Sequence, residues 1–152
     1  MIELKIAEIE ENKRLKEERF GKWRFILAKQ DSTILLYAGI VPDDTKAAIN
    51  YRHVDIARQN NLSVDNVIGG GDIHYTLGDL SIGGSSFKFG PVPNQIMEEF
   101  AKILLKEYGE KYSINIIDIN MDSDYIGKEG IEFWKELGYS FDNRRRVLER
   151  VK

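Results

Sequence analysis

The chain has 152 residues, of which 42% are hydrophobic and 31% charged, and its formal net charge is −3. This length matches one domain, so we expect residues 1–152 to fold around a single core. The absence of cysteine excludes disulfides, thiolate catalysis and zinc sites built on sulfur. No apolar run is long enough to span a bilayer, and the negative balance gives no overall attraction for nucleic acid, so a small-molecule or protein partner is expected.

The N-terminal residues alternate between charged and apolar side chains and lack the basic-then-apolar layout of a secretory signal, so we expect a cytoplasmic protein. This alternation predicts a strand over Ile2–Ile9, and the mixed charges that follow predict a solvated helix over Glu10–Phe20. Two apolar runs, Trp23–Ala28 and Thr33–Ile40, flank a short polar group and predict a β-hairpin.

The rest of the chain mixes helical and extended patterns. Pro42-Asp43-Asp44-Thr45 has the composition of a helix start, and the pattern continues to about Asn60 with Ile49 and Ile56 on the buried side. Two more helices are expected, one from Pro91-Val92-Pro93 to near Gly109 and one over Lys128–Leu137. The remaining predicted strands are Val64–Tyr75, Asp79–Phe89, Ser113–Ile119 and a last one near Val147–Val151. The order predicts an α/β fold of the α+β kind, a mixed β-sheet flanked by helices.

Glycines cluster in the middle of the chain, at Gly69–Gly71, at Gly83-Gly84 and at Gly90. Glycine weakens a strand, so such clusters indicate bulges or close backbone approach, and they can present backbone N–H groups to an anion. No glycine run opens a helix that continues with Lys-Ser/Thr, and the dinucleotide-binding fingerprint is missing as well. The motifs therefore give no support for nucleotide binding, and no cofactor is predicted.

The chain has two histidines, the side chain used most often for acid/base and phosphoryl-transfer work near neutral pH. His53 lies on the predicted helix among charged neighbours, which by itself favours an inert surface position. His74 alternates with Ile73 and Tyr75 beyond the glycines, so its side chain faces away from theirs and toward solvent.

Two charged segments are candidate binding sites. Residues 118–129 have the oxygen-ligand spacing of an EF-hand loop, but Ser123 stands where glycine makes the sharp turn, and a strand precedes the loop where a helix is needed. An acidic strand-to-helix loop is favoured over a calcium site, and no metal is predicted. The basic C-terminal residues Arg144–Arg146, Arg150 and Lys152 are typical of a solvated edge.

Four segments together resemble the Janus/Ocnus family, whose animal members are protein phosphohistidine phosphatases. They are Trp23–Leu27, Tyr51–Ile56, the glycine-rich Ile68–Ile73 and Gly84–Pro91, and they occur in the family's order. The resemblance covers about residues 23–122, which leaves residues 1–22 as an N-terminal addition of a strand and a helix. Residues 123–152 are then a C-terminal addition of a helix and a strand.

The resemblance implies a phosphorylated protein, a phosphorylated peptide or a small anionic ligand as the partner. The family's catalytic histidine falls on His53, and its basic residue on the first hairpin strand falls on Arg24. Its phosphate-binding loop falls on Ser86 and Lys88, and Gly70 and Gly71 would offer backbone amides. The family has arginine after the triple glycine, where this chain has Asp72, and a further basic position falls near Thr45. An aspartate repels phosphate, which predicts an altered or lost reaction.

A second resemblance, over Gly130–Tyr139, is to the closing helix of GNAT-type N-acetyltransferases, and it implies acetyl-CoA as a substrate. The pyrophosphate loop of that family would fall on residues 88–93, where Pro91 and Pro93 remove N–H donors, so this function ranks second. A third alternative is a non-catalytic domain that docks a protein or peptide along exposed strand edges. The oligomeric state is left open.

Overall fold

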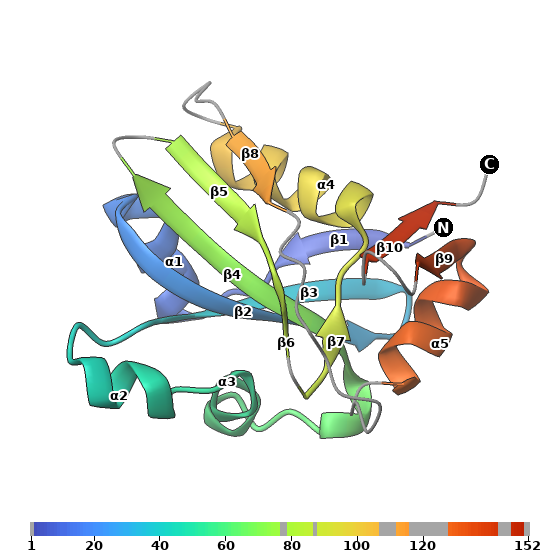
Figure 1. Ribbon diagram of the computed structural model, residues 1–152, viewed down its shortest axis with the longest axis horizontal. Coiled ribbons are helices and arrows are strands. Elements are labelled where there is room, and N and C mark those ends of the chain that lie inside the picture. Colours follow the sequence, from blue (N-terminus) through green and yellow to red (C-terminus); the bar gives the residue numbers. More distant parts are fainter. Residues whose placement is uncertain are drawn as a thin grey trace.

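The computed structural model describes residues 2–76, 79–86, 88–106, 112–115, 128–142 and 147–150. A six-stranded sheet with the strand order β1-β3-β2-β4-β5-β8 forms its centre (Figure 1). β2 pairs antiparallel with β3 and β4, and β4 pairs antiparallel with β5. β1 runs parallel to β3, and β8 runs parallel to β5. The sheet is therefore mixed and carries helices, which confirms the predicted α+β class.

The elements follow one another along most of the chain with short connections. The strands of the main sheet are β1 Glu3–Ile6, β2 Gly21–Gln30, β3 Thr33–Ile40, β4 Val67–Thr76, β5 Asp79–Gly83 and β8 Tyr112–Asn115. Two separate strand pairs are β6 Ser85–Ser86 with β7 Gly90–Pro91, and β9 Tyr139–Asp142 with β10 Val147–Arg150. The helices are α1 Glu10–Glu18, α2 Thr45–Asn50, α3 His53–Gln59, α4 Asn94–Leu105, α5 Lys128–Glu136 and the short 3-10 helix η1 Val64–Asn66.

One face of the sheet carries the larger hydrophobic core. Alternate residues of β2, among them Trp23 and Phe25, are fully buried there with residues of β3, β4 and β5. Helix α4 covers this face through Phe100 and its neighbours, and α1 and α5 add Leu15 and Trp134. The indole Nε1–H of Trp134 donates to the carbonyl oxygen of Ile68 at 2.7 Å, which fixes α5 against the start of β4. Most of the buried apolar surface therefore lies on this side.

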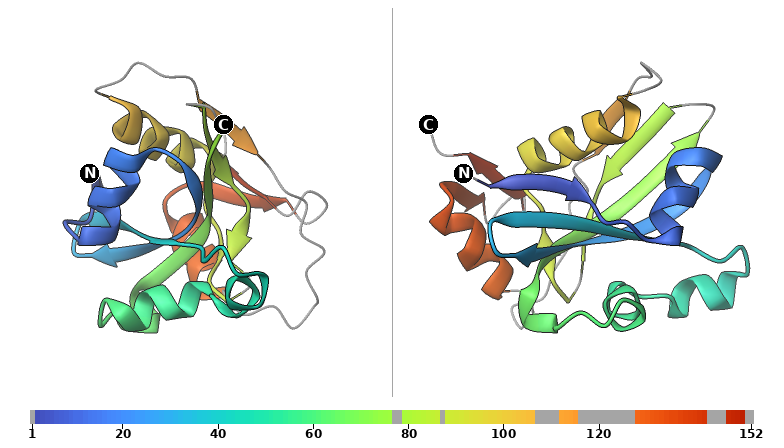
Figure 2. Two further views of the ribbon diagram at one scale, coloured as in Figure 1. Left: turned by 90° about the vertical axis from the view of Figure 1, so that its left-hand side faces the viewer. Right: turned by 180° about the vertical axis from the view of Figure 1, so that it is seen from behind.

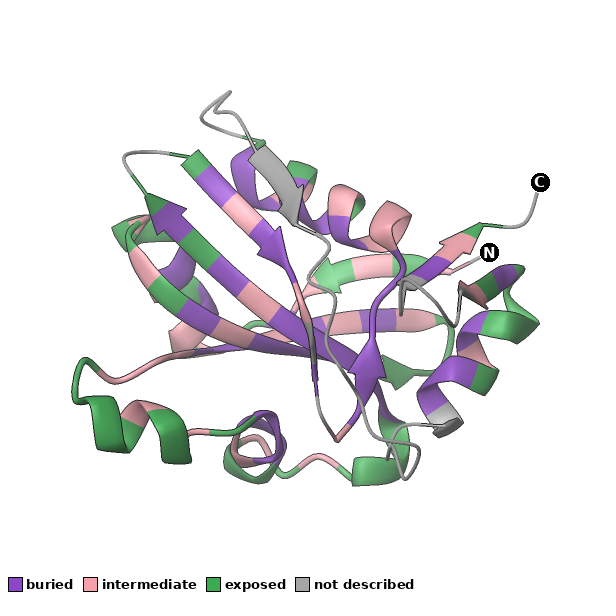
Figure 3. Cartoon of the chain, in the orientation of Figure 1, coloured by how far each residue is buried: buried purple, intermediate pink, exposed green. Residues whose placement is uncertain are grey.

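The opposite face has a smaller core beneath α3, with α2 and α3 on the other side of the sheet from α4 (Figure 2). Its buried members are Ile26, Val54, Ile56, Ala57, Val67 and Phe89. Helix α2 contributes no buried residue, and in Figure 3 it is almost entirely exposed. This face is consequently covered over only part of its area. No helix among the described residues is both long and apolar enough to cross a bilayer.

The helix predicted from Pro42 to Asn60 is wrong as one element, because it breaks at Tyr51 and Arg52. Asp44 caps α2 by accepting a hydrogen bond from the Ala47 N–H at 2.8 Å. A new start follows, in which the Asp55 carboxylate accepts the Arg52 N–H at 2.8 Å. The second of these caps lies at the break and therefore outweighs the continuous helical pattern. Ile49, expected in the core, is 72% exposed, whereas Ile56 is fully buried.

Other bounds also differ from expectation. The strand predicted over Asp79–Phe89 ends at Gly83, because Gly84 has a φ of 74°, a left-handed conformation that glycine adopts without strain. The N-terminal strand is shorter than predicted, and β7 and β9 were not predicted. Residues 118–127 of the loop with EF-hand spacing lie outside the described residues. The same holds for Arg144–Arg146 and Lys152. The α5 bounds, Lys128–Glu136, match the predicted helix to one residue.

Candidate functional site

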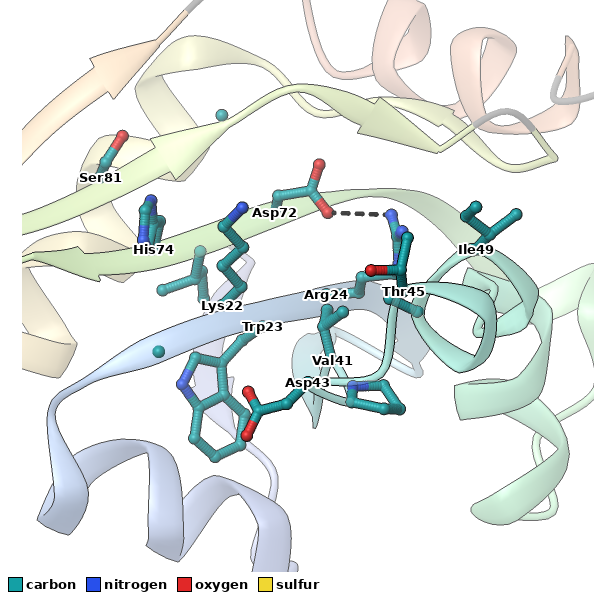
Figure 4. A pocket seen from close by; sticks show the side chains of 15 residues that line it. Lys22, Trp23, Arg24, Val41, Asp43, Thr45, Ile49, Asp72, His74 and Ser81 are labelled. Carbon is teal, nitrogen blue, oxygen red and sulfur yellow. Dashed lines mark hydrogen bonds and ion pairs between the residues drawn. The ribbon is translucent and has the colours of Figure 1, made fainter.

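A pocket of about 850 Å³ lies on the incompletely covered face of the sheet. Its floor comes from β2, β4 and β5, and its wall comes from the connection between β3 and α2 together with α2 itself (Figure 4). The lining residues are Gly21, Lys22, Trp23, Arg24, Val41, Pro42, Asp43, Thr45, Ala48, Ile49, Asp72, Ile73, His74, Ser81 and Gly83. The pocket exists because α2 buries nothing on the sheet and stands off its surface.

Strand register determines which floor residues share this face. Arg24 lies directly opposite Asp72, and Lys22 lies directly opposite His74, in the antiparallel β2–β4 pair. Directly opposed residues of an antiparallel pair point to the same side, so these four side chains form two neighbouring rows. His74 is exposed, as its alternation with Ile73 and Tyr75 predicted. Its Nε2 lies 3.3 Å from the Thr76 hydroxyl oxygen.

Arg24 and Asp72 form an ion pair in the floor of the pocket, with Nη1 3.4 Å from Oδ1. The Arg24 side chain is 27% exposed and that of Asp72 is 46% exposed. The Arg24 Nε is buried and has no hydrogen-bond partner among the described residues. Burial raises the pKa of Asp72, and the nearby charges of His53 and Arg24 oppose this increase. Because Nη1 pairs with Asp72 and the buried Nε is out of reach, Nη2 is the guanidinium nitrogen left for a bound group.

His53 is the first residue of α3 and points into the small core, where it is 8% exposed. Its Nε2 lies 2.8 Å from the carbonyl oxygen of Gly71. A carbonyl only accepts, so this nitrogen carries the proton and donates. Burial lowers the pKa of His53, and the hydrogen bond to Gly71 and the charge of Asp72 oppose that effect. The ring is therefore held as a neutral imidazole with one nitrogen already engaged.

The two glycines of the predicted site keep space for their neighbours. A Cβ at Gly70 would lie 2.7 Å from the Phe25 carbonyl oxygen, 3.1 Å from His53 Cδ2 and 3.2 Å from Ser86 Cβ. A Cβ at Gly71 would overlap the carbonyl oxygen of Gly83. Both positions thus require glycine because the adjoining strand backbones and the His53 ring approach so closely.

The two loop residues of the predicted site, Ser86 and Lys88, lie at the turn between β6 and β7. Ser86 is fully buried, and its hydroxyl oxygen accepts the Phe89 N–H at 3.1 Å, which closes the turn between β6 and β7. Lys88 is half-buried within this turn. Both residues lie outside the pocket lining.

The structure brings His53, Gly70 and Ser86 together. Asp72 lies close enough to His53 for its charge to affect the pKa of the ring, and Arg24 is the ion-pair partner of Asp72. Of the six residues predicted for the site, however, Arg24 alone lines the pocket. Lys22, Asp43 and His74 line it without having been predicted as site residues. Period-two alternation from Arg24 and Asp72 would have found Lys22 and His74. Nothing in the sequence indicated Asp43, which had been interpreted as a helix-start residue.

The described residues contain no group of three or more His, Asp or Glu side chains placed to hold a metal ion. No protein-family model matches the chain, and no match was found among curated proteins. The resemblances to the Janus/Ocnus and GNAT families therefore stay predictions that rest on short motifs. The geometry of the pocket is the evidence on which a function can be argued.

Proposed function

We propose that this protein is a Janus/Ocnus-like domain that binds a phosphorylated or otherwise anionic ligand in the pocket, through Arg24 and Lys22. The observation that supports it is Arg24, whose guanidinium lies in the pocket floor, is 27% exposed and pairs with Asp72 through Nη1. Lys22 lies one row away on the same face and is exposed. Guanidinium and ammonium groups make the strongest hydrogen bonds to phosphate and carboxylate oxygens.

The position of His53 favours binding over hydrolysis. A nucleophile or general base must come within hydrogen-bond reach of the reacting group. The His53 ring is buried beside Gly70, and its Nε2 donates to the Gly71 carbonyl. Asp72 also adds a carboxylate beside Arg24, which offsets part of the positive charge that would stabilise a transferring phosphoryl group. We therefore infer that phosphohistidine hydrolysis is lost and that His53 supports the strand backbone beneath the pocket.

The test is calorimetric titration of the full chain with inorganic phosphate and with a phosphohistidine peptide. Arg24→Gln should weaken binding of both by roughly tenfold or more, because a charge-assisted hydrogen bond is lost. Arg58→Gln is the matched control, since Arg58 is an exposed arginine on α3 that lies outside the pocket lining. Thermal unfolding of each variant checks that the fold is kept.

Two results would contradict this proposal. The first is the absence of binding to either probe at millimolar concentration, or binding that Arg24→Gln leaves unchanged. The second concerns the reaction. Release of phosphate from the peptide by the unmodified protein, abolished by His53→Gln, would show that His53 is catalytic after all.

A further inference from the structure

The charges in the pocket are balanced. Two cationic side chains, Lys22 and Arg24, and two carboxylates, Asp43 and Asp72, line it. Arg24 and Asp72 are paired with each other across β2 and β4. That leaves Lys22 and Asp43, whose side chains take part in no ion pair or hydrogen bond with the other described residues. A ligand carrying only negative charge would satisfy Lys22 and leave Asp43 facing an anion.

Lys22 and Asp43 come from different parts of the pocket. Lys22 comes from β2 in the floor, and its ammonium group points up toward Asp72 (Figure 4). Asp43 lies on the connection between β3 and α2, and its carboxylate lies apart from the Lys22 ammonium in the same view. The two opposite charges thus face the pocket without meeting, and one occupant with both signs of charge can bridge them.

The structure assigns this pocket a zwitterionic ligand, an aminoalkyl phosphate. Its phosphate would bind Lys22 and the free guanidinium N–H groups of Arg24, and its ammonium group would bind Asp43. This assignment rests on the proposed function, because the anionic end uses the same site. It adds the second charge, which the anion-binding proposal leaves open.

The apolar part of the lining fits a short aliphatic spacer between these charges. Val41 and Pro42 precede Asp43 and line the pocket, and Ile49 of α2 is 72% exposed there. An isoleucine that contributes nothing to either core has apolar surface left to cover. Methylene groups between an ammonium and a phosphate would cover part of it, which favours an aminoalkyl phosphate over inorganic phosphate.

The experiment compares phosphoethanolamine, ethyl phosphate and ethylamine by calorimetry on the full chain. Phosphoethanolamine should bind about tenfold more tightly than ethyl phosphate. Asp43→Asn should remove this preference without weakening the binding of ethyl phosphate, whereas Lys22→Gln should weaken both phosphates. Asp65→Asn, an exposed carboxylate on η1 outside the lining, is the matched control and should change nothing.

The outcomes separate the two proposals. If ethyl phosphate binds as tightly as phosphoethanolamine, or if Asp43→Asn keeps the preference, the zwitterion assignment is wrong and the anion-binding function stands. Ethylamine that binds as tightly as phosphoethanolamine would overturn both, because the site would then recognise only the cation. Failure of every phosphate probe would also overturn both.

Discussion

The two faces of the central sheet are built from the same strands and differ sharply. On one face, Phe25, Leu27 and Leu80 are fully buried in one core with residues of α4 and α5. On the other, the intervening residues Arg24 and Asp72 face the pocket. A single period-two alternation therefore produces a core on one side and a candidate binding surface on the other. The difference teaches that the stability of this fold and its candidate function draw on separate sets of residues.

The largest effect is expected on the core face. Phe100 of α4 is fully buried, so Phe100→Ala should lower the free energy of unfolding by about 3–5 kcal/mol through lost burial and the cavity left behind. Chemical denaturation followed by far-UV circular dichroism measures this loss. Glu99→Ala, at an exposed neighbouring position, should change it by less than about 0.5 kcal/mol.

The comparison breaks down if Phe100→Ala also abolishes binding of phosphate under conditions where the variant is folded. That result would mean that the two faces are coupled. Unchanged affinity in the folded variant supports their independence.

A smaller effect is expected at the boundary between the faces, where His53 is buried as a neutral ring. Its pKa is lowered in the folded state, so the unfolded chain takes up a proton first as the pH falls. Stability should therefore be unaffected by this group above its ordinary pKa of 6.5. Below that pH, stability should decline by up to about 1.4 kcal/mol per pH unit until the folded-state pKa is reached.

The substitution His53→Gln removes this titration while keeping a donor able to reach the Gly71 carbonyl. Urea denaturation at a series of pH values should show a shallower decline below pH 6.5 in the variant. His74→Gln is the matched control for the loss of one histidine and should keep the slope of the unmodified protein. An equal slope in the His53 variant would assign the decline to other groups.

Sequence patterns predicted the hairpin and α5 well, because local alternation and helical periodicity determine such elements. The break at Tyr51 was not predicted, since the cap between Asp55 and Arg52 competes there with a continuous apolar pattern. The pocket was also not predicted from the sequence, for a different reason. It depends on strand register, which pairs Lys22 with His74, and on α2 standing off the sheet. Both are long-range properties that a window of neighbouring residues does not contain.

The same limit explains the candidate site. The resemblance brought His53, Gly70, Ser86 and Arg24 together from distant segments, and the structure does place them near one another. It gave no indication that the His53 ring is buried, because burial depends on how α3 packs over Ile26 and Phe89. The order of the motifs therefore carries no information on access to a ligand, which required the packed structure.

The smallest effect is expected at Ile49, the residue for which the helical pattern and the structure disagree most. It is 72% exposed, so Ile49→Ala should change the free energy of unfolding by no more than about 0.5 kcal/mol. Ile56→Ala is the matched variant in α3, where complete burial predicts a loss of about 2–5 kcal/mol. Equal losses in denaturant titrations would mean that α2 packs on the sheet in solution and closes the pocket. A small loss at Ile49 beside a large one at Ile56 would instead support an α2 that stands off the sheet, which is the condition for any ligand to reach Lys22 and Arg24.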